Sequence, residues 1–264
     1  MSSSVSSKRL KNYLDKQLGG MQSELDELSN KRDEEKLHKL RVRAKKVKAV
    51  SGFLKNCLGH NKKYSTREMK ELYEKAGKVR TAHLNLATID EHAIRNGLLE
   101  KDQKQVIEKE FGVIDHQNKK FKKSLNRLRR KLRENIHAIK ARCAVDYYYS
   151  NIRILSDELR VIDEGRLHEC RKIIKRLLYN QEILPITVLN KIQINVGYLK
   201  NLENLIGDWH DTLVSLQWLQ QTGQAGVQDL VSLENQKQEQ LHKIIQETRE
   251  FDSNVMLANS TDYR

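Results

Sequence analysis

Positively charged side chains recur at the spacing of one helical face along the stretch LHKLRVRAKKVKAV, residues 37–50. On an α-helix, where successive residues are rotated by about 100°, four of them share an arc of about 80°. These four are His38, Arg41, Lys45 and Lys48. An apolar stripe runs directly beside this arc. The cations therefore border the expected core, a position from which side chains can line an anion-binding groove between helices.

The same pattern occurs again 130 residues further along the chain. This offset aligns Arg41, Lys45 and Lys46 of the first stretch with Arg171, Lys175 and Arg176, and it aligns His38 with His168. Carried forward without adjustment, it also aligns Gly77 with Gly207 and Arg80 with His210. Two separated segments that agree at one offset predict a duplicated four-helix unit, with its halves facing each other about a pseudo-twofold axis.

Apolar residues recur with the α-helical period over most of the chain, and strand-like alternation is absent from the pattern. The pattern predicts a first set of helices over residues 7–29, 31–58, 65–95 and 98–142, and a second over 145–161, 165–181, 185–221 and 227–257. Turn signals separate them at 59–65, 96–97, 163–165, Pro185 and 222–226. The serine-rich start is expected to be a short disordered lead-in. We therefore predict an all-α fold of two antiparallel four-helix bundles, over residues 1–142 and 143–264, as halves of one domain.

A third basic segment, residues 119–142, holds eleven Lys and Arg residues against one Glu. Lys122, Arg129, Arg133 and Lys140 share one helical face beside an apolar row. So many like charges on adjacent helices repel each other, and a bound polyanion would offset that repulsion. A single basic stripe is ordinarily a solvent-exposed helix face with no ligand. Repetition of the stripe at matched positions favours an anion-binding role instead.

The net charge of +14 is unevenly distributed along the 264 residues. Residues 1–200 hold 45 Lys and Arg against 25 Asp and Glu, whereas residues 201–264 hold 4 against 10. A concentrated positive field attracts anionic partners and raises their association rate. We therefore expect an anionic partner.

Cysteine content and hydropathy indicate the compartment. The three cysteines, Cys57, Cys143 and Cys170, are widely spaced, and we expect reduced core thiols in the cytoplasm. The longest apolar runs fall short of the roughly 18 residues that a membrane span needs. The first residues lack the apolar region of a secretory signal.

The residues 37–49 resemble the first signature of the CHAD family, the histidine-containing α-helical domain, which has a histidine followed by a run of spaced arginines. Residues 167–184 resemble the second-half signature, and residues 206–219 resemble the family's Gly-x-x-His-Asp segment at Gly207, His210 and Asp211. Lysine replaces arginine at three positions of the first motif, and Leu178 replaces the last arginine of the second. The first-half counterpart of His-Asp is Arg80-Thr81, which lacks the acid.

The resemblance spans residues 7–257 and implies two four-helix halves with a basic channel or groove that binds inorganic polyphosphate, with association with polyphosphate granules in some members. Polyphosphate carries about one negative charge per phosphate and no bases, so its binding needs charge density, from lysine point charges and bidentate arginines. We expect these side chains to bind it: His38, Arg41, Lys45, Lys46, Lys48, Arg80, Lys122, Arg129, Arg133, His168, Arg171, Lys175, Arg176 and His210. We expect no cofactor and no metal.

Three alternatives stay open. A nucleic-acid binding protein would share the charge, but no helix-turn-helix or RNP motif is evident, and the tyrosines of residues 146–150 are better explained as helix-packing residues. An enzyme acting on phosphate chains would need several carboxylates or an activated nucleophile, and we expect Asp211 to anchor His210 or a nearby arginine instead. A scaffold recruited to granules through the acidic C-terminal region is the third.

Overall fold

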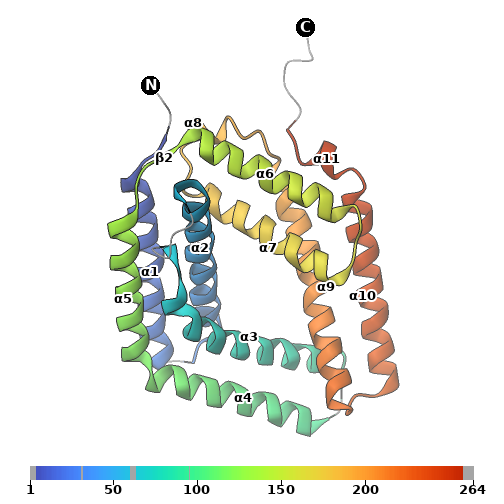
Figure 1. Ribbon diagram of the computed structural model, residues 1–264. Helices are drawn as coiled ribbons and strands as arrows, with labels where there is room; N and C mark the ends of the chain where they lie inside the picture. The colour runs from blue at the N-terminus through green and yellow to red at the C-terminus, as the bar shows by residue number, and fades with distance from the viewer. Residues whose placement is uncertain (1–3, 31, 60–63, 95, 258–264) are drawn as a thin grey trace.

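The computed structural model describes residues 4–30, 32–59, 64–94 and 96–257, and these ranges are almost entirely helical. The long helices are arranged like the sides of a frame (Figure 1), with α1 (Ser7–Asn30), α2 (Glu34–Leu58) and α5 (Asn118–Asn135) along one side. The next side holds α3 (Lys70–Glu91) and α4 (Gly97–His116). The remaining sides hold α9 (Val196–Thr222) with α10 (Val227–Thr248), and α6 (Ala141–Leu159) with α7 (Glu164–Gln181). The prediction of an all-α fold is confirmed.

Helix starts follow the expected capping chemistry. The side chains of Asp33, Asn96, Asp163 and Asn195 accept hydrogen bonds from the first backbone N–H groups of α2, α4, α7 and α9. Each of these polar residues stands just before an apolar stripe, so the local sequence determines the residue at which the helix begins. The predicted turn at 59–65 lies mostly outside the described residues.

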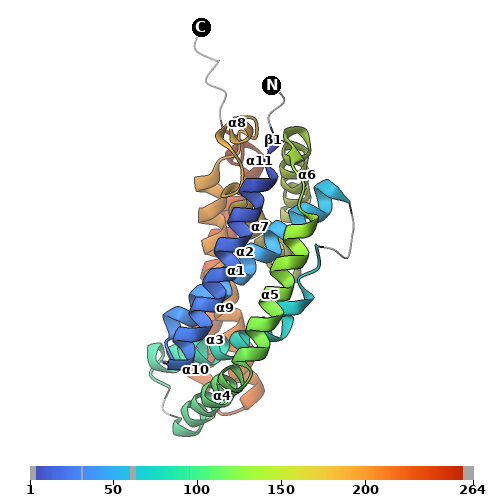
Figure 2. The ribbon, with the colours of Figure 1, turned by 90° about the vertical axis from the view of Figure 1, so that its left-hand side faces the viewer.

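The predicted single helix over residues 98–142 is wrong. The chain turns a corner between α4 and α5, where the Asn118 side chain donates a hydrogen bond to the Leu25 carbonyl of α1 at 2.8 Å. The α5 helix then runs along α1 (Figure 2) and ends at Asn135, whose carbonyl accepts a bond from the Tyr64 hydroxyl. Helical periodicity continues through the corner, so the pattern alone does not reveal it.

The predicted helix over 185–221 is also divided. A short helix, α8 (Ile186–Leu189), is followed by Gln193 with a left-handed backbone and by the Asn195 cap that starts α9. Near the C-terminal end, α10 stops at Thr248 and a short α11 (Phe251–Asn254) follows. A 3₁₀ turn (η2, Arg67–Met69) precedes α3, which therefore begins later than predicted.

The expected disordered lead-in is ordered from Ser4. Strand β1 (Ser4–Val5) pairs antiparallel with β2 (Ile139–Lys140), and Val5 is completely buried. The two-residue ladder thus ties the start of the chain to the segment that joins α5 and α6.

Helix neighbours follow the order expected from a duplication. The α2–α3 and α3–α4 contacts of the first half have counterparts in the α7–α9 and α9–α10 contacts of the second. The corresponding helices also meet directly, α2 with α7 and α3 with α9. The main apolar core continues through both halves. The duplication, with halves at 1–142 and 143–264, remains a proposal that these contacts support.

The prediction of three reduced thiols is wrong for two of them. Cys57, near the end of α2, forms a disulfide with Cys143 of α6, with Cα atoms 5.7 Å apart. Cys170 is a free thiol buried in the core, where burial raises its pKa to about 12. Sequence spacing could not indicate the pairing because the two cysteines are 86 residues apart and meet only after the helices pack.

The disulfide predicts a stability difference. Replacing Cys57 with Ser opens a long covalent loop in the unfolded chain and is expected to lower the free energy of unfolding by about 2 to 4 kcal/mol. Urea denaturation of the wild type and of Cys57→Ser, each with and without dithiothreitol, measures it. Dithiothreitol should destabilise the wild type alone. A wild-type midpoint that does not respond to the reductant would contradict the cross-link.

Candidate functional site

Two arginines lie against glycines of the neighbouring helix. An added Cβ at Gly77 of α3 would stand 2.9 Å from Nη1 of Arg41, and one at Gly207 of α9 would stand 2.7 Å from Nη2 of Arg171. Both pairs are related by the 130-residue offset. The absence of a side chain at each glycine lets a flat guanidinium lie on the surface of the next helix. The glycines thus fix the position of two cations on α2 and α7.

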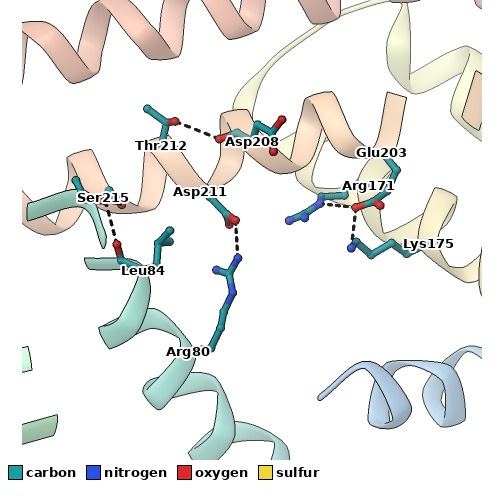
Figure 3. A network of polar contacts seen from close by, with 10 residues as sticks. Arg80, Leu84, Arg171, Lys175, Glu203, Asp208, Asp211, Thr212 and Ser215 are labelled. Carbon is teal, nitrogen blue, oxygen red and sulfur yellow. Dashed lines mark hydrogen bonds and ion pairs between the residues drawn. The ribbon is translucent and has the colours of Figure 1, made fainter. Parts of the chain in front are cut away.

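The two arginines differ in what they bind. Arg41 donates from Nη1 to the Tyr73 carbonyl at 3.2 Å, and its guanidinium lies 4.9 Å from the centre of the Tyr73 ring. Arg171 donates from Nε to the Glu203 carboxylate at 3.1 Å. Lys175 contacts the same carboxylate oxygen at 2.7 Å (Figure 3). One arginine therefore has a neutral partner and the other an acidic one.

A third arginine bridges the two halves. Arg80 extends from α3 to the carboxylate of Asp211 on α9 (Figure 3). In the sequence, Thr81 follows Arg80 where the family motif has an acid, and in the structure Asp211 of α9 supplies a carboxylate to Arg80. Asp211 therefore holds an arginine, in line with the expectation of an anchoring role.

Lysines of the two halves meet where α2 packs on α7. Burial, together with repulsion from the nearby charges of Lys175, Arg41, Arg171 and Arg80, lowers the pKa of Lys45 to about 7. We call the convergent set of six side chains the central cationic cluster. Its members are His38, Arg41, Lys45, Arg80, Arg171 and Lys175.

One histidine, His38, belongs to this cluster, and His168 and His210 lie beside it. Partial burial lowers the pKa of His38, and the charges of Lys45 and Arg80 add to that effect. The rings of His168 and His210 are 4.6 Å apart, and burial followed by repulsion from His168 and Arg171 lowers the pKa of His210 to about 4. At neutral pH the His210 side chain is therefore uncharged.

The structure does not bring all the predicted residues together. Lys48 stays close to the cluster, with Nζ 3.5 Å from the centre of the Tyr73 ring. Lys46 pairs with Glu182 at 2.6 Å, and Arg176 is exposed near Tyr147 of α6.

The three predicted cations of α5 face α1 instead. Lys122 pairs with Asp26, and both Arg129 and Arg133 pair with Asp15. Helix α5 borders the outer side of the frame (Figure 1), so its basic face serves contacts with α1 rather than the central cationic cluster.

Sequence reasoning missed the acidic and neutral partners of the cluster. Glu203 and Tyr73 occupy matched positions at the 130-residue offset, and each faces the arginine of its own half. The matched glycines were the available signal, since a glycine inside a long helix needs a reason, and close approach of another group is a common one. The identity of the approaching group required the packing of α2 on α3 and of α7 on α9.

Within the described ranges, no three His, Cys, Asp or Glu side chains gather closely enough to hold a metal ion. Over the same ranges, no helix has the length and apolar character needed to cross a membrane.

Comparison with known proteins identifies the class. The CHAD domain profile matches residues 12–220, and the chain therefore belongs to the CHAD domain family, a helical binding domain and not a known enzyme family. The crystal structure of the CHAD domain from the plant Ricinus communis is similar, with a TM-score of 0.67 at 14% identity. The alignment covers 96% of this chain and 91% of that one. Comparison with curated proteins yields no match.

The glycine contacts predict a separation of stability from binding. Gly52 of α2 has nothing within 4 Å of an added Cβ, so Gly52→Ala should stabilise the fold by about 0.5 to 1 kcal/mol and leave anion binding unchanged. Gly77→Ala and Gly207→Ala should displace Arg41 and Arg171 and lower polyanion affinity roughly fivefold. Thermal melts and polyphosphate titrations of the three variants test this. Equal binding by all three would contradict the role of the two glycines.

Proposed function

We propose that the protein binds inorganic polyphosphate, without catalysis, through the central cationic cluster. The observation that supports this most directly is the convergence of six basic side chains from α2, α3 and α7, against the carboxylates of Glu203 and Asp211. Because the like charges of such a set repel each other, binding of an anion among them lowers the electrostatic energy. The cations of α5 are left out of the proposed site because acids of α1 neutralise them.

The chemistry of the cluster suits phosphate chains. Guanidinium groups grip phosphate oxygens in pairs, ammonium groups act as point charges, and neutral imidazoles donate single N–H bonds. A flexible chain with about one charge per phosphate can follow cations along several helices, and counterion release would supply most of the affinity. Binding of this kind would also bring the protein to polyphosphate granules.

Nucleic acid is the alternative partner, and the tyrosines disfavour it. Sequence-tolerant binding of single strands uses exposed aromatic rings on which bases stack. The Tyr73 ring is already covered by Arg41 and Lys48. Tyr147 and Tyr148 are buried, and the Tyr148 hydroxyl donates to the Leu177 carbonyl, as expected of helix-packing residues. Polyphosphate, which has no bases, fits these surroundings better.

Catalysis is a weaker proposal. Phosphoryl transfer enzymes use carboxylates to hold metal ions that neutralise charge in the transition state. Glu203 and Asp211 instead form ion pairs with Arg171, Lys175 and Arg80, which occupies them as counterions.

A competition titration tests the proposed function. Long-chain polyphosphate is titrated into the purified protein at two salt concentrations, with duplex DNA as competitor. We expect tight binding that weakens steeply with salt and that DNA does not displace. Easy displacement by DNA at equal charge would instead show a general polyanion binder.

The surroundings of Lys45 predict a pH dependence of binding. Its pKa of about 7 in the free protein means that the side chain loses its charge as the pH rises through neutrality. A bound polyanion favours the charged form and raises this pKa, so binding takes up a proton just above pH 7. Affinity should therefore be highest below pH 7 and fall between pH 7 and 8.5. Calorimetric titrations in buffers of different ionisation enthalpy measure the proton uptake.

Lys45→Met supplies the matching test. The lowered pKa of Lys45 means that its charge destabilises the folded protein at and below neutral pH, so the variant should be more stable there by roughly 1 to 2 kcal/mol. Binding should weaken and lose its pH dependence above pH 7. Lys39→Met, which removes an exposed cation of α2 paired with Glu35, is the control and should change neither property strongly. Retention of the full pH dependence in Lys45→Met would refute the assignment.

A further inference from the structure

Glu203 occupies the place between two cations where a phosphate oxygen would fit. One carboxylate oxygen accepts from Arg171 Nε at 3.1 Å and from Lys175 Nζ at 2.7 Å. The Glu203 side chain is only 13% exposed, so the ion pairs are partly shielded from water. An anionic oxygen of a phosphate group would accept hydrogen bonds from the same guanidinium and ammonium groups.

The matched place in the first half has no such anion. The 130-residue offset relates Glu203 to Tyr73, which offers Arg41 a backbone carbonyl and an aromatic face but no negative charge. Within the described ranges, neither Arg41 nor Lys45 forms an ion pair with an acidic side chain. Glu74 lines a surface pocket together with Arg41, but it is exposed and pairs with Lys70.

We infer that Glu203 is an internal competitor for phosphate, so that the central cationic cluster has one open phosphate subsite, at Arg41 and Lys45, and one closed subsite, at Arg171 and Lys175. This inference rests on the proposed function and deepens it. A phosphate enters the open subsite without displacing any group. A phosphate enters the closed subsite only if the Glu203 carboxylate leaves, so the first half binds first and Glu203 limits the total affinity.

The test compares two carboxylates in equivalent surroundings. Glu203→Gln removes the negative charge, keeps the side-chain size and frees two cations of the closed subsite. Asp15→Asn is the matched control, since Asp15 is 15% exposed and also lies between two cations, Arg129 and Arg133, but on the α1–α5 side of the frame. Both variants change the net charge by the same amount. The probe is long-chain inorganic polyphosphate, titrated at two salt concentrations.

Glu203→Gln should bind polyphosphate roughly fivefold to tenfold more tightly than the wild type, with a steeper salt dependence because two more cations release counterions. Asp15→Asn should bind like the wild type. An equal gain in polyphosphate affinity in both variants would show that only net charge matters, and it would overturn the inference. Unchanged or weaker binding by a folded Glu203→Gln would also overturn it, because Glu203 would then be a positioning residue for Arg171. A wild type that fails to bind would remove the proposed function itself.

A second variant works in the opposite direction and does not depend on the folding of the first. Tyr73→Glu places a carboxylate at the matched position of the open subsite, beside Arg41. It should lower polyphosphate affinity at least about fivefold relative to Tyr73→Gln, which removes the ring without adding charge. Circular dichroism confirms that both variants are folded. Equal affinities of Tyr73→Glu and Tyr73→Gln would overturn the distinction between open and closed subsites.

Discussion

Repulsion between like charges held together at the contact of α2 and α7 is the constraint on which the rest of this structure depends. Lys45 is adjacent in sequence to Ala44, which is completely buried, as are Leu40 and Val47 one turn away on the same face. Burial of that stripe fixes the rotation of α2, and Lys45 cannot move far from the charges of α7 without exposing apolar surface. The apolar core therefore offsets the electrostatic cost of the cluster.

This arrangement connects stability to function. Removing a charge from the cluster is expected to stabilise the fold and to weaken anion binding, which is the usual relation where a site is held in an unfavourable state by its surroundings. The glycines act in the same direction. Gly77 and Gly207 give up helix propensity so that Arg41 and Arg171 lie flat against α3 and α9. Each feature costs folding free energy and preorganises a cation.

The sequence predicted the all-α fold, the two basic stripes and all six side chains that form the cluster, because helical periodicity and one offset determine which side chains share a face. The sequence did not predict the surroundings of the α5 cations, because the basic face of α5 has the same pattern as the other stripes but pairs with acids of α1. That difference depends on which helix packs opposite, and helical periodicity contains no information about the partner. The disulfide between Cys57 and Cys143 and the position of Glu203 were missed for the same reason, since each joins segments from different helices.

The residues that face the two matched arginines differ, although the arginines themselves are related by the 130-residue offset. A duplication that kept identical residues would bind phosphate equally in both halves, whereas here Tyr73 faces one arginine and Glu203 faces the other. Arg80 also departs from the repeat, because its counterpart at the 130-residue offset is His210, whose pKa of about 4 leaves it neutral, and Arg80 itself pairs with Asp211 of α9. Among the described residues, Arg41 and Lys45 have no acidic partner, whereas Arg171 and Lys175 share Glu203. In the two-subsite arrangement that we propose, a flexible polyanion would meet the open cationic end first, and each phosphate that follows would compete with the Glu203 carboxylate.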